Sequence, residues 1–171
     1  MQQIQAVILM QQFDKLIQET KRRRENADYL TAQLREIPGI QTVRLPENSQ
    51  AVWHLYPFRY DAQQFHGLSR NRFMHALSAE GVPCSDVYHE QYFDGLLDET
   101  INSRGYQRLF SAQRLKEYRD SFHDLKGNRQ VCETTVAITQ NLLLAERSHM
   151  DHIVEAIRKL QSHSAALAKI S

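Results

Sequence analysis

The chain has 171 residues and a formal net charge of +1, with 21 Lys and Arg against 20 Asp and Glu. This length fits one ordinary domain, and the balanced charge argues against a nucleic-acid module that depends on general basic charge. No apolar run approaches the roughly 18 residues of a membrane span. The N-terminus lacks a secretory pattern, and two cysteines are too few for a disulfide framework, so we expect a cytoplasmic protein that binds neither membranes nor nucleic acid.

The first predicted element is one long helix over residues 3–36, which Pro38-Gly39 ends. Its second half carries apolar side chains at helical spacing, with polar residues on the outer face. Its first turns are apolar on more than one face, which is typical of a helix buried on several sides. We therefore expect a covering surface for this start, which includes Ile4, Val7, Ile8, Leu9 and Met10.

Two strands are predicted next, over residues 40–45 and 51–60, and the second is rich in aromatic residues. Pro57 cannot donate a backbone hydrogen bond, which predicts a sheet edge or a bulge at that position. Ser69 is the expected N-cap of a helix that runs to Ala79 and ends at Gly81. An extended segment over residues 82–87 follows.

Residues 88–105 show no clean period and are predicted to form a long loop. Further helices are expected from about Leu115 to Gly127 and over residues 128–134, followed by a strand at 136–138. A final helix is predicted to begin at Ser148. This order indicates an α+β fold, in which a small, mostly antiparallel sheet is covered by helices.

For several residue clusters we prefer a structural interpretation over a functional one. The cations Lys21 to Arg24 fit a solvated helix face, since nearby carboxylates balance them. His149 and His152 are three residues apart, with Glu146 nearby, and could bind a metal. A zinc site needs three or four ligands, and Cys84 and Cys132 do not have the spacing of metal ligands. We therefore predict no metal site.

Two pairs could in principle carry chemistry. Cys84 could be a nucleophile with His89 as its base, but their spacing in an extended segment does not place the two side chains next to each other. We therefore favour a packed thiol. Asp86 and Glu90 are interpreted as ordinary loop charges, because nothing fixes their separation. No catalytic residue is assigned in this chain.

The segment Tyr88-His89-Glu90-Gln91-Tyr92 is more informative. It follows a predicted strand and opens the longest irregular stretch of the chain. Polar and aromatic groups on a loop that a sheet supports are suited to ligand contact. A surface loop with aromatic anchors is the alternative interpretation.

Four stretches together resemble the C-terminal part of the DegT/DnrJ/StrS family, the pyridoxal-phosphate-dependent aminotransferases of keto-sugars and cyclitols. The sequences of residues 79–85 and 140–144 are most similar to those of glutamine-dependent inosose aminotransferases. The four stretches lie in the family's order and together span about residues 3–161. They are Gln5 to Ala27 with Leu30, His54 to Tyr60, Leu68 to Tyr88, and Gln140 to Lys159.

This resemblance implies the small domain of an aspartate-aminotransferase-like fold, with an inter-domain helix over residues 1–36 and the small domain over 37–171. A large domain that holds pyridoxal phosphate would be the missing partner, and a homo-oligomer is expected. The family's Schiff-base lysine motif is not found around any lysine here, namely Lys15, Lys21, Lys116, Lys126, Lys159 and Lys169. We therefore expect no cofactor to be bound by this chain itself.

The resemblance further implies substrate contacts from the loop after the Pro83-Cys84-Ser85 strand, and from the residues before the last helix. These candidate substrate-binding residues are Tyr88, His89, Gln91, Gln140 and Asn141. The implied activity is transfer of an amino group from glutamine or glutamate to a keto-sugar or cyclitol, with this chain inactive alone. A stand-alone, non-catalytic α+β binding or interaction domain, or a structural remnant, remains the alternative.

Overall fold

The computed structural model describes residues 3–169, which divide into two compact units. Unit 1 comprises residues 3–85 and 136–169, and unit 2 comprises residues 86–135. Each unit has its own cluster of buried apolar side chains. The candidate site residues are distributed over both.

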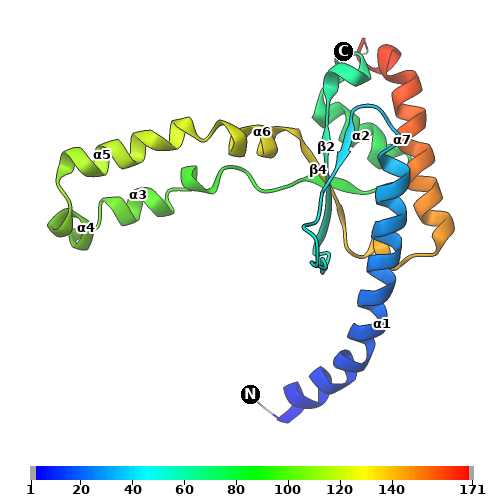
Figure 1. The fold of residues 1–171 in the computed structure, drawn as a ribbon, viewed down its shortest axis with the longest axis horizontal. Coiled ribbons are helices and arrows are strands. Elements are labelled where there is room, and N and C mark those ends of the chain that lie inside the picture. The colour runs from blue at the N-terminus through cyan, green and yellow to red at the C-terminus, as the bar shows by residue number, and fades with distance from the viewer. Residues whose placement is uncertain (1–2, 170–171) are drawn as a thin grey trace. The chain divides into compact units, whose positions relative to one another are not determined.

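Unit 1 contains the long helix α1 (Gln3–Leu34), the helices α2 (Arg70–Ala79) and α7 (Arg147–Leu167), and most of the sheet. The strands are β1 (Ile40–Thr42), β2 (Leu55–Tyr60), β3 (Cys84–Asp86) and β4 (Thr135–Thr139), in the order β1-β2-β4-β3. In Figure 1, α1 and α7 run side by side next to this sheet, and both helices pack against each other. The small antiparallel sheet, its helical cover and the long first helix confirm the predicted fold class.

Aromatic rings form the centre of the unit 1 core. Phe73 of α2 stacks on Tyr60 of β2, with ring centroids 4.4 Å apart, and meets Phe58 and Phe65 edge-on. The alternating burial of β2 explains this arrangement, because Tyr56, Phe58 and Tyr60 all lie on one face of the strand. Burial raises the pKa of Tyr56 to about 12.

The position of Pro57 differs from one of its two predicted alternatives, a sheet edge. β2 is the second strand of the sheet, between β1 and β4, and not an edge strand. The register with β1 ends at the pair Thr42 and Phe58, so Pro57 lies just beyond the residues paired on that side. A proline is tolerated there because no β1 residue is paired with it.

The strands are also shorter than predicted. β1 ends at Thr42 and not at residue 45, and β2 begins at Leu55 and not at residue 51. Ala51 instead accepts a hydrogen bond from Nε of Arg24 through its carbonyl oxygen, at 3.2 Å. Trp53, which precedes β2, packs against Tyr56, with ring centroids 5.2 Å apart.

Local capping explains the helix boundaries in unit 1. The Ser69 hydroxyl accepts from the backbone N–H of Arg72, as predicted, and Gly81 at a φ of +86° follows the helix end. The last helix begins at Arg147, one residue before the predicted Ser148. Its N-cap is Glu146, whose carboxylate pairs with Arg22 of α1 at 2.7 Å and makes no cap hydrogen bond. That contact holds the pKa of Glu146 below its usual value.

The cation run Lys21 to Arg24 is engaged within unit 1. Arg23 pairs with Glu19 at 3.1 Å, and Lys21 lies 3.8 Å from Glu25. The carboxylate partners agree with the predicted charge balance, but the face is not fully solvated, because Arg22, Arg23 and Arg24 are half-buried and the Arg23 side chain is 11% exposed.

Asn26 of α1 links that helix to the turn after β4. Its side chain is 4% exposed, and its amide donates to the carbonyl oxygens of Leu143 and Ala145 at 2.8 and 3.0 Å. We expect Asn26→Ala to lower the free energy of unfolding by about 1–3 kcal/mol, because the Leu143 and Ala145 carbonyls both lose the Asn26 amide, while the Ala145 carbonyl keeps the 3.3 Å hydrogen bond from Nε of Arg22. Urea denaturation measures this change. The exposed Asn71→Ala is the matched control, and an equal loss in both variants would contradict the role of Asn26.

Unit 2 consists of short helices, which are α3 (Leu96–Ile101), α4 (Arg104–Leu109), α5 (Ala112–Asp120) and α6 (Lys126–Thr134). Its core contains only the buried Tyr92, Ile101, Leu115 and Phe122, with Leu97 packed against them. Arg119 donates from Nε and from one terminal nitrogen to the two carboxylate oxygens of Asp98. Its guanidinium lies over the rings of Phe93 and Phe122, at 5.2 and 5.3 Å from the ring centroids. A charged group thus supplements a small apolar core.

Two predictions for unit 2 were wrong. Residues 88–105 contain α3, the start of α4 and a short 3-10 turn, where we expected a loop. Helices of six residues span fewer than two turns, so they show no readable period. Gly127 does not close a helix but lies inside α6, while α5 ends earlier, at Asp120.

Candidate functional site

The segment after β3 forms one wall of a concavity in unit 2. Tyr88 is 61% exposed, and His89 and Gln91 are also exposed, whereas Tyr92 is buried. Tyr92 anchors the segment because its ring contacts those of Phe93 and Phe122, at 4.6 and 5.4 Å. A buried aromatic anchor thus carries exposed aromatic and polar neighbours, as a binding loop requires.

The other wall is formed by α6 and the residue before it. Asn128, Val131 and Cys132 lie three and four residues apart and therefore share one face of this helix. The concavity, which we call the Tyr88 pocket, has a volume of about 610 Å³. It is lined by Val87, Tyr88, His89, Gln91, Tyr92, Leu125, Asn128, Val131 and Cys132. Three of the five predicted substrate-binding residues therefore lie in one pocket.

Two titratable side chains beside the Tyr88 pocket, His89 and Glu90, each have a partner. His89 interacts with the carboxylate of Asp94, and Glu90 lies 3.4 Å from Nε of Arg129. Glu90 therefore has a partner on α6, and our interpretation of Asp86 and Glu90 as ordinary charges missed this link. Arg129 carries no sequence signal of its own, because it is one polar residue on a short helix.

The remaining two candidates, Gln140 and Asn141, belong to unit 1. They form the turn between β4 and a short 3-10 segment, where their carbonyl oxygens accept from the N–H groups of Leu143 and Leu144. The side chain of Asn141 is exposed and that of Gln140 is half-buried. Their predicted contact with substrate stays a prediction.

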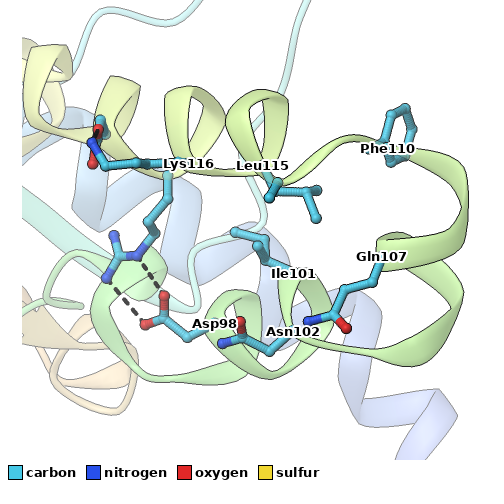
Figure 2. A pocket seen from close by; sticks show the side chains of 10 residues that line it. Asp98, Ile101, Asn102, Gln107, Phe110, Leu115 and Lys116 are labelled. Atoms are coloured by element: carbon cyan, nitrogen blue, oxygen red, sulfur yellow. Dashed lines mark hydrogen bonds and ion pairs between the residues drawn. The ribbon is translucent and has the colours of Figure 1, made fainter.

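A second depression lies between α3, α4 and α5 of unit 2, with a volume of about 530 Å³. Figure 2 shows Ile101 and Leu115 at its centre, with Asp98, Asn102 and Gln107 along one side. Lys116 also lines it but pairs with Asp120 at 2.8 Å. None of the predicted site residues lines this depression.

Cys84 is a packed thiol of unit 1. It is half-buried, and its Sγ lies 3.6 Å from the carbonyl oxygen of Met74 and 3.9 Å from the Ser78 hydroxyl. Burial raises the pKa of the Cys84 thiol, which disfavours the nucleophilic thiolate.

We therefore expect Cys84 to react slowly with iodoacetamide at pH 7.5. The alkylation rate should increase with pH, and the midpoint of this increase should lie above the pKa of an unfolded cysteine. A raised pKa leaves less thiolate at any given neutral pH. Alkylation of a Cys132→Ser variant over a pH series measures this midpoint. A midpoint below that of the urea-unfolded variant would contradict a packed thiol.

The histidines His149 and His152 of α7 are the candidate metal ligands considered above. His152 donates from Nε2 to the carbonyl oxygen of Glu80 at 2.8 Å, at the end of α2, and His149 is exposed. Within residues 3–169, no three His, Cys, Asp or Glu side chains are grouped closely enough to hold a metal ion. In the same range, no helix is long and apolar enough to cross a bilayer.

All six lysines lie within residues 3–169, and all six are exposed. Lys159 pairs with Glu80, and a hydrogen bond to Asp120 raises the pKa of Lys116. A nucleophilic lysine requires burial or a cationic neighbour that lowers its pKa. None of the six lysines is buried.

Residues 1–117 match the sequence profile of the DegT/DnrJ/EryC1/StrS aminotransferase family. A protein of Streptoalloteichus tenebrarius named an L-glutamine:3-amino-2,3-dideoxy-scyllo-inosose aminotransferase is 25% identical over 169 residues, which are 96% of this chain and 40% of that protein. An L-glutamine:scyllo-inosose aminotransferase of Streptomyces griseus is 27% identical over 158 residues, which are 91% of this chain and 36% of that protein.

The solved structure of 3-amino-5-hydroxybenzoic acid synthase shares the fold, with a TM-score of 0.61 at 15% identity over 89% of this chain and 36% of that one. The aminotransferase TlmJ of Streptoalloteichus hindustanus gives a TM-score of 0.55 at 18% identity, over 84% of this chain and 32% of that one. The chain thus spans about 40% of the length of its curated relatives. By its sequence match over residues 1–117, it belongs to the DegT/DnrJ/EryC1/StrS aminotransferase family.

Proposed function

We propose that this chain forms the small C-terminal domain, with its preceding inter-domain helix, of an aminotransferase that uses pyridoxal phosphate. The match to the aminotransferase family over residues 1–117 carries this proposal. The relatives that align with nearly all of this chain are named as L-glutamine-dependent aminotransferases of inososes. We therefore assign glutamine or glutamate as the amino donor and a keto-sugar or cyclitol as the acceptor. The division at residue 36 into helix and small domain belongs to the same proposal.

The lysines of this chain do not fit the cofactor. Pyridoxal phosphate in such enzymes is held through a lysine amine, and the six lysines here are exposed, with Lys116 and Lys159 engaged by carboxylates. In our proposal the cofactor lysine is contributed by a large domain outside this sequence. The chain alone is then inactive, and the complete enzyme is a homo-oligomer.

The Tyr88 pocket is the proposed contact surface for the acceptor. Tyr88 offers an exposed aromatic ring, and His89 and Gln91 offer an imidazole and an amide that exchange hydrogen bonds with hydroxyl groups. Gln140 and Asn141 are proposed as further contacts from unit 1. Sugars and cyclitols present both an apolar ring face and many hydroxyls, so this mixture of groups is suited to them.

The test is an assay of the longer protein that contains this chain, with L-glutamine and scyllo-inosose as substrates. Amino transfer by the longer protein and none by residues 1–171 is the expected result. No transfer by the longer protein to scyllo-inosose or to a panel of keto-sugars would overturn the proposal and favour a non-catalytic binding domain.

A second experiment examines the pocket. We expect Gln91→Ala to raise KM for the acceptor by up to about tenfold, the effect of one lost hydrogen bond, with a smaller change in kcat. Gln107→Ala is the matched control, because Gln107 is an exposed glutamine of unit 2 outside the Tyr88 pocket. Equal KM values for the two variants would remove Gln91 from the binding surface.

A further inference from the structure

The two walls of the Tyr88 pocket come from segments that are far apart in the sequence. Residues 87–92 form one wall, and Leu125 with α6 forms the other, about 35 positions later. Both walls belong to unit 2, whose core contains only four buried apolar residues. So small a core gives the walls little stabilisation by burial, and specific contacts between them gain importance.

One ion pair joins these walls directly. The Glu90 carboxylate lies 3.4 Å from Nε of Arg129, and the two side chains are 20% and 37% exposed. Glu90 occupies the N-cap position of the 3-10 turn at residues 91–93, yet its side chain makes no cap hydrogen bond. Its carboxylate is directed to α6 instead of to its own turn.

The position of Glu90 in the chain allows this ion pair to affect two residues that line the pocket. It stands between His89 and Gln91, which both line the pocket, while Arg129 directly follows the lining residue Asn128. If Glu90 lost Arg129 and were displaced, His89 and Gln91 would move with it, because they are its direct neighbours in the chain. Tyr92 packs on Phe122 on the far side of Gln91 and limits the movement at that end.

We infer that the Glu90–Arg129 ion pair clasps the two walls of the Tyr88 pocket, and that Arg129 is a positioning residue for the ligand bound there. This inference rests on the proposed function for the identity of that ligand. Arg129 does not line the pocket and acts through Glu90 on His89 and Gln91.

The clasp itself is testable in the 171-residue chain. Cys132 lines the pocket on α6, so its alkylation by iodoacetamide in a Cys84→Ser background reports access to the pocket. We expect Arg129→Met and Glu90→Gln to raise the alkylation rate by up to about fivefold, the range for a partly exposed ion pair. Lys116→Met, which removes the exposed pair with Asp120 in the same unit, should leave the rate unchanged. An unchanged rate in both pair variants would overturn the clasp.

Charge reversal distinguishes the pair from a general loss of structure. The double variant Glu90→Arg with Arg129→Glu restores an opposite pair, and it should bring the alkylation rate back toward that of the parent. A rate as high as in the single variants would show that α6 is disturbed for another reason, and would count against the clasp.

The positioning role is tested in the longer protein. Arg129→Met should raise KM for scyllo-inosose by up to about fivefold with kcat nearly unchanged, and Arg129→Lys should retain most of the affinity. An active enzyme whose KM does not respond would overturn the positioning role while the proposed function stands. A longer protein without any amino transfer overturns the proposed function and the role of Arg129 together, although the alkylation rate would still report the clasp.

Discussion

Phe73→Ala should remove a large part of the stability of unit 1. Phe73 is fully buried and touches three other rings, with Tyr60 stacked on it at 4.4 Å. Truncation of a buried phenylalanine costs about 3–5 kcal/mol, from lost transfer free energy and the cavity left behind. Domains of this size have only about 5–15 kcal/mol in total, so a large part of the population is expected to unfold on mild warming.

Thermal denaturation followed by circular dichroism measures this effect. Phe110→Ala is the matched control, because Phe110 is 45% exposed and lies outside both buried clusters. The melting temperature should fall by many degrees in the first variant and by little in the second. A melting temperature of Phe73→Ala within about one degree of the parent would contradict the aromatic centre of the core.

The first half of α1 should make the isolated chain self-associate. Eight large apolar residues between Ile4 and Ile17 are each 48–73% exposed, which is an unusual apolar surface for a helix. They are Ile4, Val7, Ile8, Leu9, Met10, Phe13, Leu16 and Ile17. In the longer protein we propose that the large domain covers this surface, and a second copy of the chain covers it when the chain is alone.

Sedimentation velocity at micromolar concentration tests this prediction. The parent chain should sediment as a dimer or larger species, whereas the double variant Met10→Glu with Phe13→Glu should sediment as a monomer. Charges placed at the contact must be desolvated and repel each other, which opposes association strongly. Lys15→Glu changes the charge of the same helix without loss of apolar area and should leave association intact. A monomeric parent would contradict the prediction.

The sequence was most informative where apolar side chains recur over a long element or where a cap residue has a specific role. The helices α1 and α7 and the N-cap Ser69 follow from such patterns, because burial of a long stripe or one hydroxyl determines the structure locally. The short helices of unit 2 could not be found in this way. Their six to nine residues are held by tertiary contacts such as Asp98 with Arg119, which no local pattern reports.

The candidate site shows the same division. Tyr88, His89 and Gln91 could be selected from a polar and aromatic loop that follows a strand, and the structure brings them together in one pocket. The opposite wall was missed, because Asn128, Val131 and Cys132 face that loop only through the fold. Arg129 was missed for the same reason, since its partner Glu90 lies 39 positions earlier in the sequence.

Reaction of the chain with pyridoxal phosphate is the most direct test of whether the cofactor lysine lies outside these residues. The purified chain would be incubated with the cofactor, reduced with borohydride and mapped by mass spectrometry. Weak labelling spread over the exposed lysines, with no amino transfer from glutamine, is the result we predict. One equivalent of cofactor fixed to a single lysine, lost on its replacement by arginine and accompanied by turnover of a keto-sugar or cyclitol, would contradict the account.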